Sequence, residues 1–425
     1  MKAMNIESSS LEAEILEQLK LAKLASVALA ALSTSQKNFA LELIERELLE
    51  SSAYILEANQ EDLNSPDNAD LSHALKDRMS LDHSRISAMA QGIRKVINLA
   101  DPVNQVLEGW RHPNGMKINK VSVPIGVIGI IYEARPNVTT DAVALAIKSG
   151  NACVLRGSKQ TWYTNNAIMD VIERALKQSD IPSEAIQYLR DKSRDSAKLM
   201  LRARDEISLI IPRGGETLKK FITENSLIPV LGAGGGNCHV YIDIDADQEK
   251  ALKIAVNAKA HRPSVCNACE SILIHKEVKD EILPALVESL LKEGVEICAD
   301  QEIHAQCPFT KLATDEDWAE EYLDMKVSIK TVESLEEAIN HINYYSNNHS
   351  EAIVTENIAR ADLFTKSINS ACVYVNASTR FTDGEEFGFG AEMGISTSTG
   401  YVRGPIGAKE LCTYKYIIEG SGQIR

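Results

Sequence analysis

The chain has 425 residues, 44% of them hydrophobic and 25% charged, and its formal net charge is −15. This length allows two or three domains with large cores, and the composition excludes a disordered or low-complexity chain. The acidic balance disfavours nucleic acid and anionic membranes as partners, because both bind basic surfaces, so an anionic ligand would need local arginines and lysines.

The cysteines and the N-terminal segment indicate the compartment. The eight cysteines are unevenly spaced, and the chain shows no charged start followed by an apolar core and a cleavage site. Both observations predict a reducing, cytoplasmic location. The early apolar run 21–32 contains Lys23 and is shorter than the about 20 apolar residues that a bilayer requires, so it is predicted to be an amphipathic helix.

Residues 11–100 are predicted to be helical, because apolar side chains recur at the helical period. Two faces carry them, formed by Leu41, Ile44, Leu48 and Ile55 and by Ile86, Met89, Ile93, Val96 and Ile97. The segment 109–123 has a Pro113-Asn-Gly turn and alternating apolar residues, which predicts a hairpin.

From Val121 onwards the pattern alternates between strand and helix. Apolar runs typical of buried strands occur at 127–131, 152–155, 207–211 and 228–231. Such alternation predicts an α/β fold with a parallel sheet covered by helices. The glycine-rich run 232–237 precedes a strand rather than a helix, so it does not fit the dinucleotide fingerprint and is predicted to be a tight turn.

Cations follow directly after the buried strand 152–155, in Leu155-Arg-Gly-Ser-Lys. Because ligands bind at the carboxyl ends of such strands, Arg156, Ser158 and Lys159 are candidate cofactor contacts, with ordinary loop charges as the alternative. The stretch Pro212-Arg-Gly-Gly-Glu opens a helix after a strand. The backbone N–H groups of Arg213, Gly214 and Gly215 are therefore candidates for binding a pyrophosphate.

Cys266 lies between a predicted helix, 249–260, and a predicted buried strand, 270–275. A free cysteine usually packs as a small hydrophobic residue. Here the nearby cations Lys259, His261 and Arg262 would lower the thiol pKa, which favours a nucleophile. Cys269 is interpreted as packing, and no metal site is predicted, because neither a second cysteine pair nor a paired-histidine spacing follows.

Several ordered motifs extend this pattern over nearly the whole chain. They are Asn257-Ala-Lys, Arg262-Pro-Ser-Val-Cys-Asn-Ala, Val123-Pro-Ile-Gly-Val-Ile-Gly-Ile-Ile-Tyr-Glu-Ala-Arg-Pro-Asn-Val, Gly236-Asn-Cys-His-Val-Tyr-Ile-Asp, Asn376-Ala-Ser-Thr-Arg-Phe, Arg403-Gly-Pro-Ile-Gly and Thr413-Tyr-Lys-Tyr. Together they resemble the gamma-glutamyl phosphate reductase family, the proline-pathway branch of the aldehyde dehydrogenase superfamily.

The resemblance implies an aldehyde-dehydrogenase-like α/β fold with two doubly wound parallel-sheet domains and a small β oligomerisation flap. The cofactor domain is expected at 1–108 and 124–236, with a return segment at about 377–405, and the catalytic domain at 237–376. The flap is expected at 109–123 and 406–425, where the strand 413–418 would pair with the hairpin. A homo-oligomer is therefore expected.

The resemblance also implies a reaction. It is the NADPH-dependent reduction of L-glutamyl 5-phosphate to L-glutamate 5-semialdehyde, through a thioester on Cys266. Asn137 and the Cys266 backbone N–H would stabilise the oxyanion. Arg135, Arg262 and Arg380 would hold the carboxylate and phosphate of the substrate. Functional coupling to glutamate 5-kinase is expected.

Three further assignments depend on the resemblance. Lys159 stands where NAD-preferring relatives carry a carboxylate, which favours NADP(H). Glu321 matches the carboxylate that binds the nicotinamide ribose, although it is equally compatible with a solvated helix end. His349 is a candidate for handling phosphate or a proton, with a capped loop histidine as the alternative.

Two other functions stay open at this point. The first is a hydrolytic semialdehyde dehydrogenase, although Ala233 stands where hydrolytic relatives carry the glutamate that activates water. The second is a cofactor-free cysteine hydrolase that uses Cys266 and His239.

Overall fold

The computed structural model describes residues 2–232, 234–400 and 402–425, without the side chains of 2–10, 73 and 74. The chain forms two compact units. Unit 1 comprises the residues up to Gly232 together with 388–394 and 406–425. Unit 2 comprises the residues between Gly232 and Gly388 together with 395–405. Among the described residues, no helix has the length and hydropathy needed to cross a membrane.

Unit 1 contains a parallel sheet with the order β5-β4-β3-β6. Its strands are β3 (Val127–Tyr132), β4 (Ala152–Arg156), β5 (Ile186–Tyr188) and β6 (Leu209–Arg213). Strands β3 and β4 are apolar and buried, as their sequence predicts. The strand predicted at 228–231 is wrong, because Val230 forms only a single bridge to Ile210.

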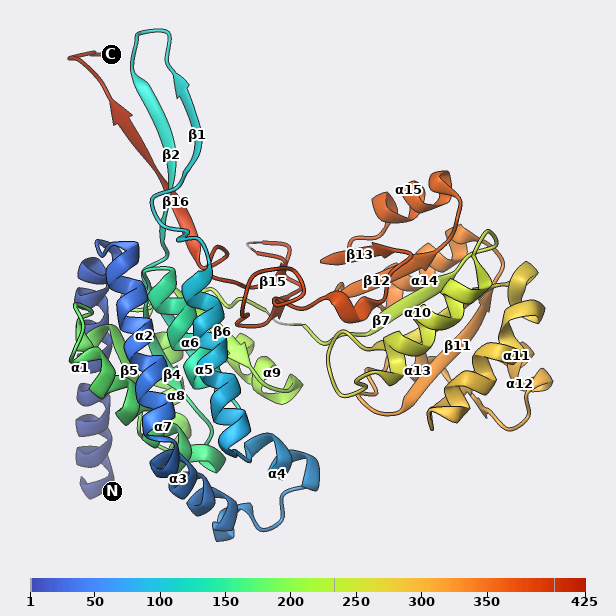
Figure 1. The fold of residues 1–425 in the computed structure, drawn as a ribbon, viewed down its shortest axis with the longest axis horizontal. Helices are drawn as coiled ribbons and strands as arrows, with labels where there is room; N and C mark the ends of the chain where they lie inside the picture. The colour runs from blue at the N-terminus through green and yellow to red at the C-terminus, as the bar shows by residue number, and fades with distance from the viewer. Residues whose placement is uncertain (1, 233, 401) are drawn as a thin grey trace. The chain divides into compact units, whose positions relative to one another are not determined.

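Helices cover both faces of this sheet and build a helical layer beyond it (Figure 1). The predicted helical region contains α1 (Lys2–Ala30), α2 (Thr34–Glu50), α3 (Ser52–Asn64), α4 (His73–Met79) and α5 (His83–Asn98). Later helices are α6 (Asn137–Lys148), α7 (Trp162–Leu176), α8 (Arg194–Arg202) and α9 (Glu216–Asn225). Both predicted apolar faces are buried, from Leu41 to Ile55 and from Ile86 to Ile97.

A three-stranded antiparallel sheet extends from unit 1 as an arm (Figure 1). It consists of β1 (Val106–Arg111), β2 (Lys117–Pro124) and β16 (Cys412–Glu419), with β2 in the centre. The predicted hairpin and its pairing with the C-terminal strand are thus confirmed. Strand β1 is exposed along its whole length.

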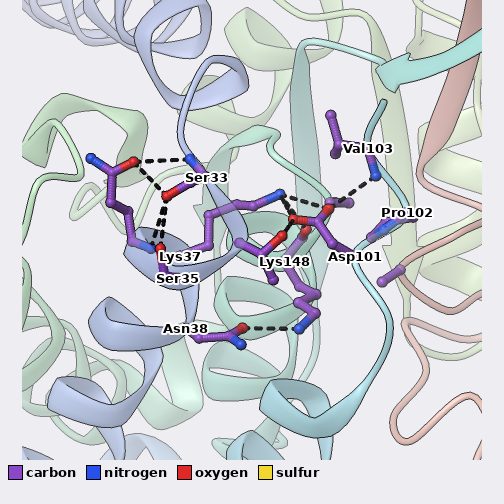
Figure 2. A network of polar contacts seen from close by, with 12 residues as sticks. Ser33, Ser35, Lys37, Asn38, Asp101, Pro102, Val103 and Lys148 are labelled. Carbon is purple, nitrogen blue, oxygen red and sulfur yellow. Dashed lines mark hydrogen bonds and ion pairs between the residues drawn. The ribbon is translucent and has the colours of Figure 1, made fainter. Parts of the chain in front are cut away.

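A buried polar network connects α2, α6 and the segment that leads to β1 (Figure 2). Lys37 Nζ lies 2.6 Å from Asp101 Oδ2, and the two side chains are 1% and 11% exposed. Lys148 Nζ donates to Asn38 Oδ1 and to the Ile97 carbonyl, both at 2.9 Å. Asp101 is therefore the anion that accompanies two buried ammonium groups.

We expect Asp101→Asn to lower the free energy of unfolding by about 3 kcal/mol, because it leaves buried ammonium groups without their counter-ion. Burial alone would raise the pKa of Asp101, but hydrogen bonds from Lys37 and other donors hold the pKa below its usual value. A depressed carboxyl pKa stabilises the folded state above the unfolded pKa of about 3.9, and this contribution is lost as pH falls through the folded pKa. Denaturant unfolding at several pH values should therefore show the largest difference near neutral pH.

The control for this prediction is Asp195→Asn. Asp195 Oδ1 is 3.5 Å from Lys198 Nζ, and the two side chains are 74% and 48% exposed. Exposed pairs of this kind contribute about 0–1 kcal/mol. An equal loss of stability in both variants would contradict the assigned role of Asp101.

Unit 2 is built on a seven-stranded parallel sheet with the order β10-β9-β11-β8-β7-β12-β13. The strands are β7 (Cys238–Ile242), β8 (Cys269–His275), β9 (Glu296–Ala299), β10 (Lys311–Leu312), β11 (Lys326–Val332), β12 (Ser350–Val354) and β13 (Cys372–Val375). One face packs on α10 (Gln248–Ala260), α11 (Lys276–Lys292) and α12 (Gln301–Gln306). The other face packs on α14 (Leu335–Tyr345) and α15 (Ile358–Ser367), while the short α13 (Asp315–Ala319) precedes β11. The predicted doubly wound parallel sheet is confirmed.

The expected return segment, 377–405, is divided between the units. Residues 377–387 and 395–405 belong to unit 2 instead of the cofactor unit. The physical reason is local: β14 (Ile395–Ser396) pairs with β15 (Gly404–Pro405), and η4 (Thr379–Phe381) is bonded to Asn267. The boundary of unit 2 also lies at 233 rather than at 237.

Candidate active site

Cys266 lies in a turn between α10 and β8, as the sequence predicts. It is half-buried, whereas Cys269, in β8, is fully buried. Burial raises the pKa of Cys269 to about 12, so its thiol stays protonated near neutral pH. Of the two cysteines in this pair, only Cys266 is placed to react.

The glycine turn before β7 lies against the backbone of Cys266. A Cβ built on Gly236 would fall 1.5 Å from the Cys266 carbonyl oxygen. The Cys238 thiol donates to the same oxygen at 3.2 Å. Residues 234–236 therefore lie against the backbone of Cys266 and limit its movement.

Arg380 is brought to this loop by η4. The Thr379 hydroxyl donates to the Asn267 carbonyl at 2.7 Å, and the Asn267 side chain donates to the Thr382 carbonyl at 2.9 Å. Burial lowers the pKa of Arg380, the nearby Arg262 lowers it further, and Cys266 acts in the opposite direction. The two arginines and the cysteine are thus within electrostatic reach of one another.

The guanidinium of Arg380 is suited to an anionic ligand. Its Nε–H is buried and donates to no partner among the described residues, whereas Arg262 is exposed. A buried donor without a partner costs free energy unless a ligand or water binds it. The pair therefore offers an anion site beside Cys266.

Glu321 does not lie at a solvated helix end. It follows α13, is half-buried, and its Oε1 accepts from the Gly236 N–H at 2.6 Å. The carboxylate therefore contacts the same turn that touches Cys266.

The two candidate histidines, His239 and His349, are buried in unit 2. His349 precedes β12, and its Nδ1 lies 2.8 Å from the Ser350 hydroxyl and 3.7 Å from the Cys238 sulfur. Its ring thus contacts the Cys238 sulfur, which in turn donates to the Cys266 carbonyl. His239 Nδ1 pairs with Glu351 at 2.9 Å, and both side chains are 0% exposed.

In unit 1, the cations after β4 have different surroundings. The Arg156 guanidinium donates to the Gly157 and Ser193 carbonyls at 3.1 and 2.8 Å, so it supports the local fold. Lys159 is exposed, and Ser158 caps the short helix that begins there. Lys192, which sequence reasoning did not single out, lies exposed with its ammonium 4.1 Å from the centre of the Trp162 ring.

The start of α9 carries a carboxylate of the protein itself. Glu133 Oε2 accepts from the Gly215 N–H at 2.8 Å, and a Cβ on Gly214 would fall 2.6 Å from the Glu133 carboxyl carbon. Arg213 lies at the end of β6, beside an open hollow that it lines with Asp141.

The remaining candidates follow β3. Asn137 is the first residue of α6, and its side-chain amide donates to Asp141 at 3.0 Å. Arg135 is exposed in the loop before this helix. Both residues belong to unit 1, whereas Cys266 belongs to unit 2.

Comparison with known proteins agrees with this geometry. Residues 13–305 match the aldehyde dehydrogenase family. A gamma-glutamyl phosphate reductase of Caldanaerobacter subterraneus subsp. tengcongensis is 50% identical over 412 residues, which cover 97% of this chain and 100% of that protein. The crystal structure of a gamma-glutamyl phosphate reductase from Thermotoga maritima matches with a TM-score of 0.95 and 44% identity, over 97% of this chain and 100% of that one. The chain belongs to the gamma-glutamyl phosphate reductase family.

More distant structures share only the fold of the gamma-glutamyl phosphate reductases. An acetylating aldehyde dehydrogenase from Geobacillus thermoglucosidasius matches with a TM-score of 0.67 at 15% identity, over 98% of each chain. Membership in this family makes the protein an enzyme with a small-molecule substrate, and implies use of a nicotinamide cofactor. The alternative of a cofactor-free cysteine hydrolase is thereby wrong, and His239 instead supports the fold through Glu351.

The reductase family's cofactor fits unit 1 in part. The exposed cations Lys159, Lys192 and Arg194 gather after β4 and β5, which suits an anionic dinucleotide. The Arg156 Nε is buried there without a partner among the described residues. At the start of α9, a pyrophosphate would have to compete with Glu133 for the Gly215 N–H.

Proposed function

We propose that this chain catalyses the NADPH-dependent reduction of L-glutamyl 5-phosphate to L-glutamate 5-semialdehyde with release of phosphate. This is a step of proline biosynthesis, and we place it in the cytoplasm. The proposal is supported most by one observation: a half-buried cysteine lies within electrostatic reach of two arginines, in a chain that is 50% identical over nearly its whole length to a gamma-glutamyl phosphate reductase.

Cys266 acts as the nucleophile. Its thiolate attacks the acyl carbon of the substrate, the carbon–sulfur bond forms, and the bond to the phosphate oxygen breaks. A reduced nicotinamide, when bound, supplies the hydride that converts the thioester to the aldehyde level. The carbon–sulfur bond then breaks, so that the aldehyde is released and the Cys266 thiolate is restored.

The arginines hold the anionic ends of the substrate. Arg380 and Arg262 are assigned to its carboxylate and phosphate, with Arg135 as a third candidate. Charge-assisted hydrogen bonds of this kind contribute roughly 1.5–3 kcal/mol each. They also favour the Cys266 thiolate over the thiol. His349 is assigned a supporting role, in which its ring contacts Cys238 next to the Cys266 backbone.

The oxyanion of the tetrahedral state is assigned to the Cys266 backbone N–H and to Asn137. Asn137 would have to exchange its present bond to Asp141 for this role. Glu321 is assigned to the nicotinamide ribose, and the bond from the Gly236 N–H to its Oε1 holds the carboxylate at the glycine turn.

Ser158 and Lys159 are assigned to the adenosine side of the cofactor, and Arg213, Gly214 and Gly215 to its pyrophosphate. The exposed ammonium of Lys159 is the basis for choosing NADPH, because the 2′-phosphate needs a cation. Arg156 supports this loop through backbone carbonyls.

We expect Lys159→Glu to weaken NADPH binding at least about tenfold and NADH binding less than about threefold, because only NADPH loses a charge-assisted bond. Fluorescence titration of the reduced nicotinamide measures both affinities. Lys177→Glu is the control, since Lys177 is also exposed but lies at the opposite end of α7. An equal loss for both cofactors would show that Lys159 does not contact the 2′-phosphate.

The decisive test of the proposed function is the reverse reaction. The purified chain should reduce NADP⁺ with glutamate 5-semialdehyde only when inorganic phosphate is present. In addition, it should release little glutamate from glutamyl phosphate without NADPH. Rapid cofactor-independent hydrolysis would favour the hydrolytic semialdehyde dehydrogenase instead. The position at issue for the hydrolytic base, Ala233, lies outside the described residues.

We also propose a homo-oligomer that forms through the β1-β2-β16 sheet. This sheet exposes Trp110, Tyr414 and Tyr416, a surface typical of protein contacts. Coupling to glutamate 5-kinase is proposed as well, because an acyl phosphate is reactive in water and benefits from direct delivery.

A further inference from the structure

A fully buried ion pair joins the two ends of the Cys266 loop. Lys259 lies in the last turn of α10, and Glu270 is the second residue of β8. Lys259 Nζ is 2.5 Å from Glu270 Oε2, and both side chains are 0% exposed. Burial raises the pKa of Glu270 above its ordinary value, and the Lys259 ammonium acts in the opposite direction, so the charge of Glu270 depends on Lys259.

Stability alone does not account for this pair. A buried ion pair contributes little net stability, because the desolvation of both charges offsets their attraction, and apolar side chains of similar volume often replace it without loss. The other contacts of the two side chains are therefore informative.

The second oxygen of Glu270 holds a turn. Glu270 Oε1 accepts from the Leu323 N–H at 3.3 Å, and Leu323 has a φ of 52°. This left-handed conformation is unfavourable for a branched side chain, so surrounding contacts must maintain it. The Lys259 ammonium also lies 6.0 Å from the centre of the Tyr322 ring. The ion pair thus contacts two consecutive residues after Glu321.

Glu321, which precedes Tyr322 and Leu323, connects this turn to the backbone of Cys266. Glu321 Oε1 accepts from the Gly236 N–H at 2.6 Å, and Gly236 packs against the Cys266 carbonyl. A Cβ on Gly235 would fall 2.6 Å from Glu321 Oε2, so the carboxylate fits closely into the glycine turn. The pair is therefore connected to Cys266 by two routes, one along the loop and one through Glu321.

We propose that Lys259 and Glu270 are positioning residues that set the places of the Cys266 thiol and the Glu321 carboxylate. The assignment of a reaction to Cys266 rests on the proposed function, whereas the geometric role of the Lys259–Glu270 pair is independent of that function. Displacement of a reacting group by about 1 Å can cost a hundredfold in rate, so two buried charges are a means of limiting such displacement.

Glu270→Gln tests this role with little change in volume. The amide has one acceptor oxygen for two donors, the Lys259 ammonium and the Leu323 N–H. We expect kcat of the reverse reaction to fall at least about tenfold, with KM values changed less than about threefold, because positioning acts mainly on the transition state. In the cofactor-free protein, alkylation of Cys266 by iodoacetamide should be slower and its pH profile shifted.

A second variant separates positioning from stability. In Lys259→Met combined with Glu270→Leu, an apolar pair replaces the charges, and we expect the melting temperature to be maintained while kcat and alkylation remain impaired. The control is Lys250→Met. Lys250 lies on the same helix α10, and its partner Glu356 follows β12; the two side chains are each 51% exposed. This variant should change none of these measurements.

The outcomes are distinguishable. Wild-type kcat and alkylation in the apolar double variant would show a purely structural pair and overturn the proposal. Should that variant fail to fold, Glu270→Gln decides alone, and wild-type values there overturn the proposal equally. If the unmodified chain showed no reductase activity, the proposed function would fail, while the alkylation comparison would still decide whether the pair positions Cys266.

Discussion

Cys266→Ala should abolish turnover, with a loss of at least about 10⁴-fold, because the thiolate forms the covalent bond to the substrate and no other group in the loop replaces it. NADPH affinity should change less than about twofold, since the proposed role of the Cys266 thiolate is to bond the substrate and not to hold the cofactor. Steady-state rates and fluorescence titration on the same preparation measure both quantities.

Cys269→Ala is the matched control, because it removes a thiol three residues away. The Cys269 sulfur is buried in β8 and donates to the Ser271 carbonyl at 3.2 Å. Its removal should cost about 1 kcal/mol of stability and leave most of the activity. An active Cys266→Ala protein together with an inactive Cys269→Ala protein would show that Cys269, and not Cys266, is the nucleophile.

Local patterns predicted much of the fold. Helical periodicity located the buried faces from Leu41 to Ile97, and the short apolar runs located β3, β4 and β8. The Pro113-Asn-Gly turn located the hairpin. These features depend on residues that are near in sequence, so a single segment contains the information. The strand expected at 228–231 was wrong because an apolar run does not specify a partner strand.

The position of Cys266 at an element junction was also predictable, because Pro263 cannot continue a helix and an apolar strand follows it. The surroundings of the charged candidate residues were less predictable. Arg156 and Lys159 follow the same strand, yet one binds backbone carbonyls and the other is exposed. Which of two neighbouring cations faces solvent depends on the path of a distant segment, here 192–193.

Contacts between distant residues could not be predicted from single segments. Glu133 meets the start of α9 across 82 residues, and Glu321 meets Gly236 across 85. The sequence predicted Glu270 at the start of a buried strand, 270–275, but it did not indicate that Lys259 is the partner of the buried carboxylate. Tertiary packing decided each of these cases.

Gly236→Ala should damage both the stability and the activity of the protein. The added Cβ would lie 1.5 Å from the Cys266 carbonyl oxygen and 2.5 Å from its carbonyl carbon. Backbone atoms cannot rotate away as a side chain can, so the turn and the Cys266 loop must separate. Overpacking of this kind costs typically about 1–3 kcal/mol, and we expect the upper end of that range.

The loss of activity in Gly236→Ala should exceed what unfolding explains. A shift of the Cys266 loop by about 1 Å should lower kcat about a hundredfold at temperatures where the variant is folded. Gly232→Ala is the control from the same glycine-rich run, since a Cβ there meets nothing within 4 Å. Thermal unfolding, kcat and the rate of Cys266 alkylation should therefore change in Gly236→Ala and stay near wild type in Gly232→Ala. Turnover within about threefold of wild type in Gly236→Ala would mean that the glycine turn does not hold the nucleophile in place.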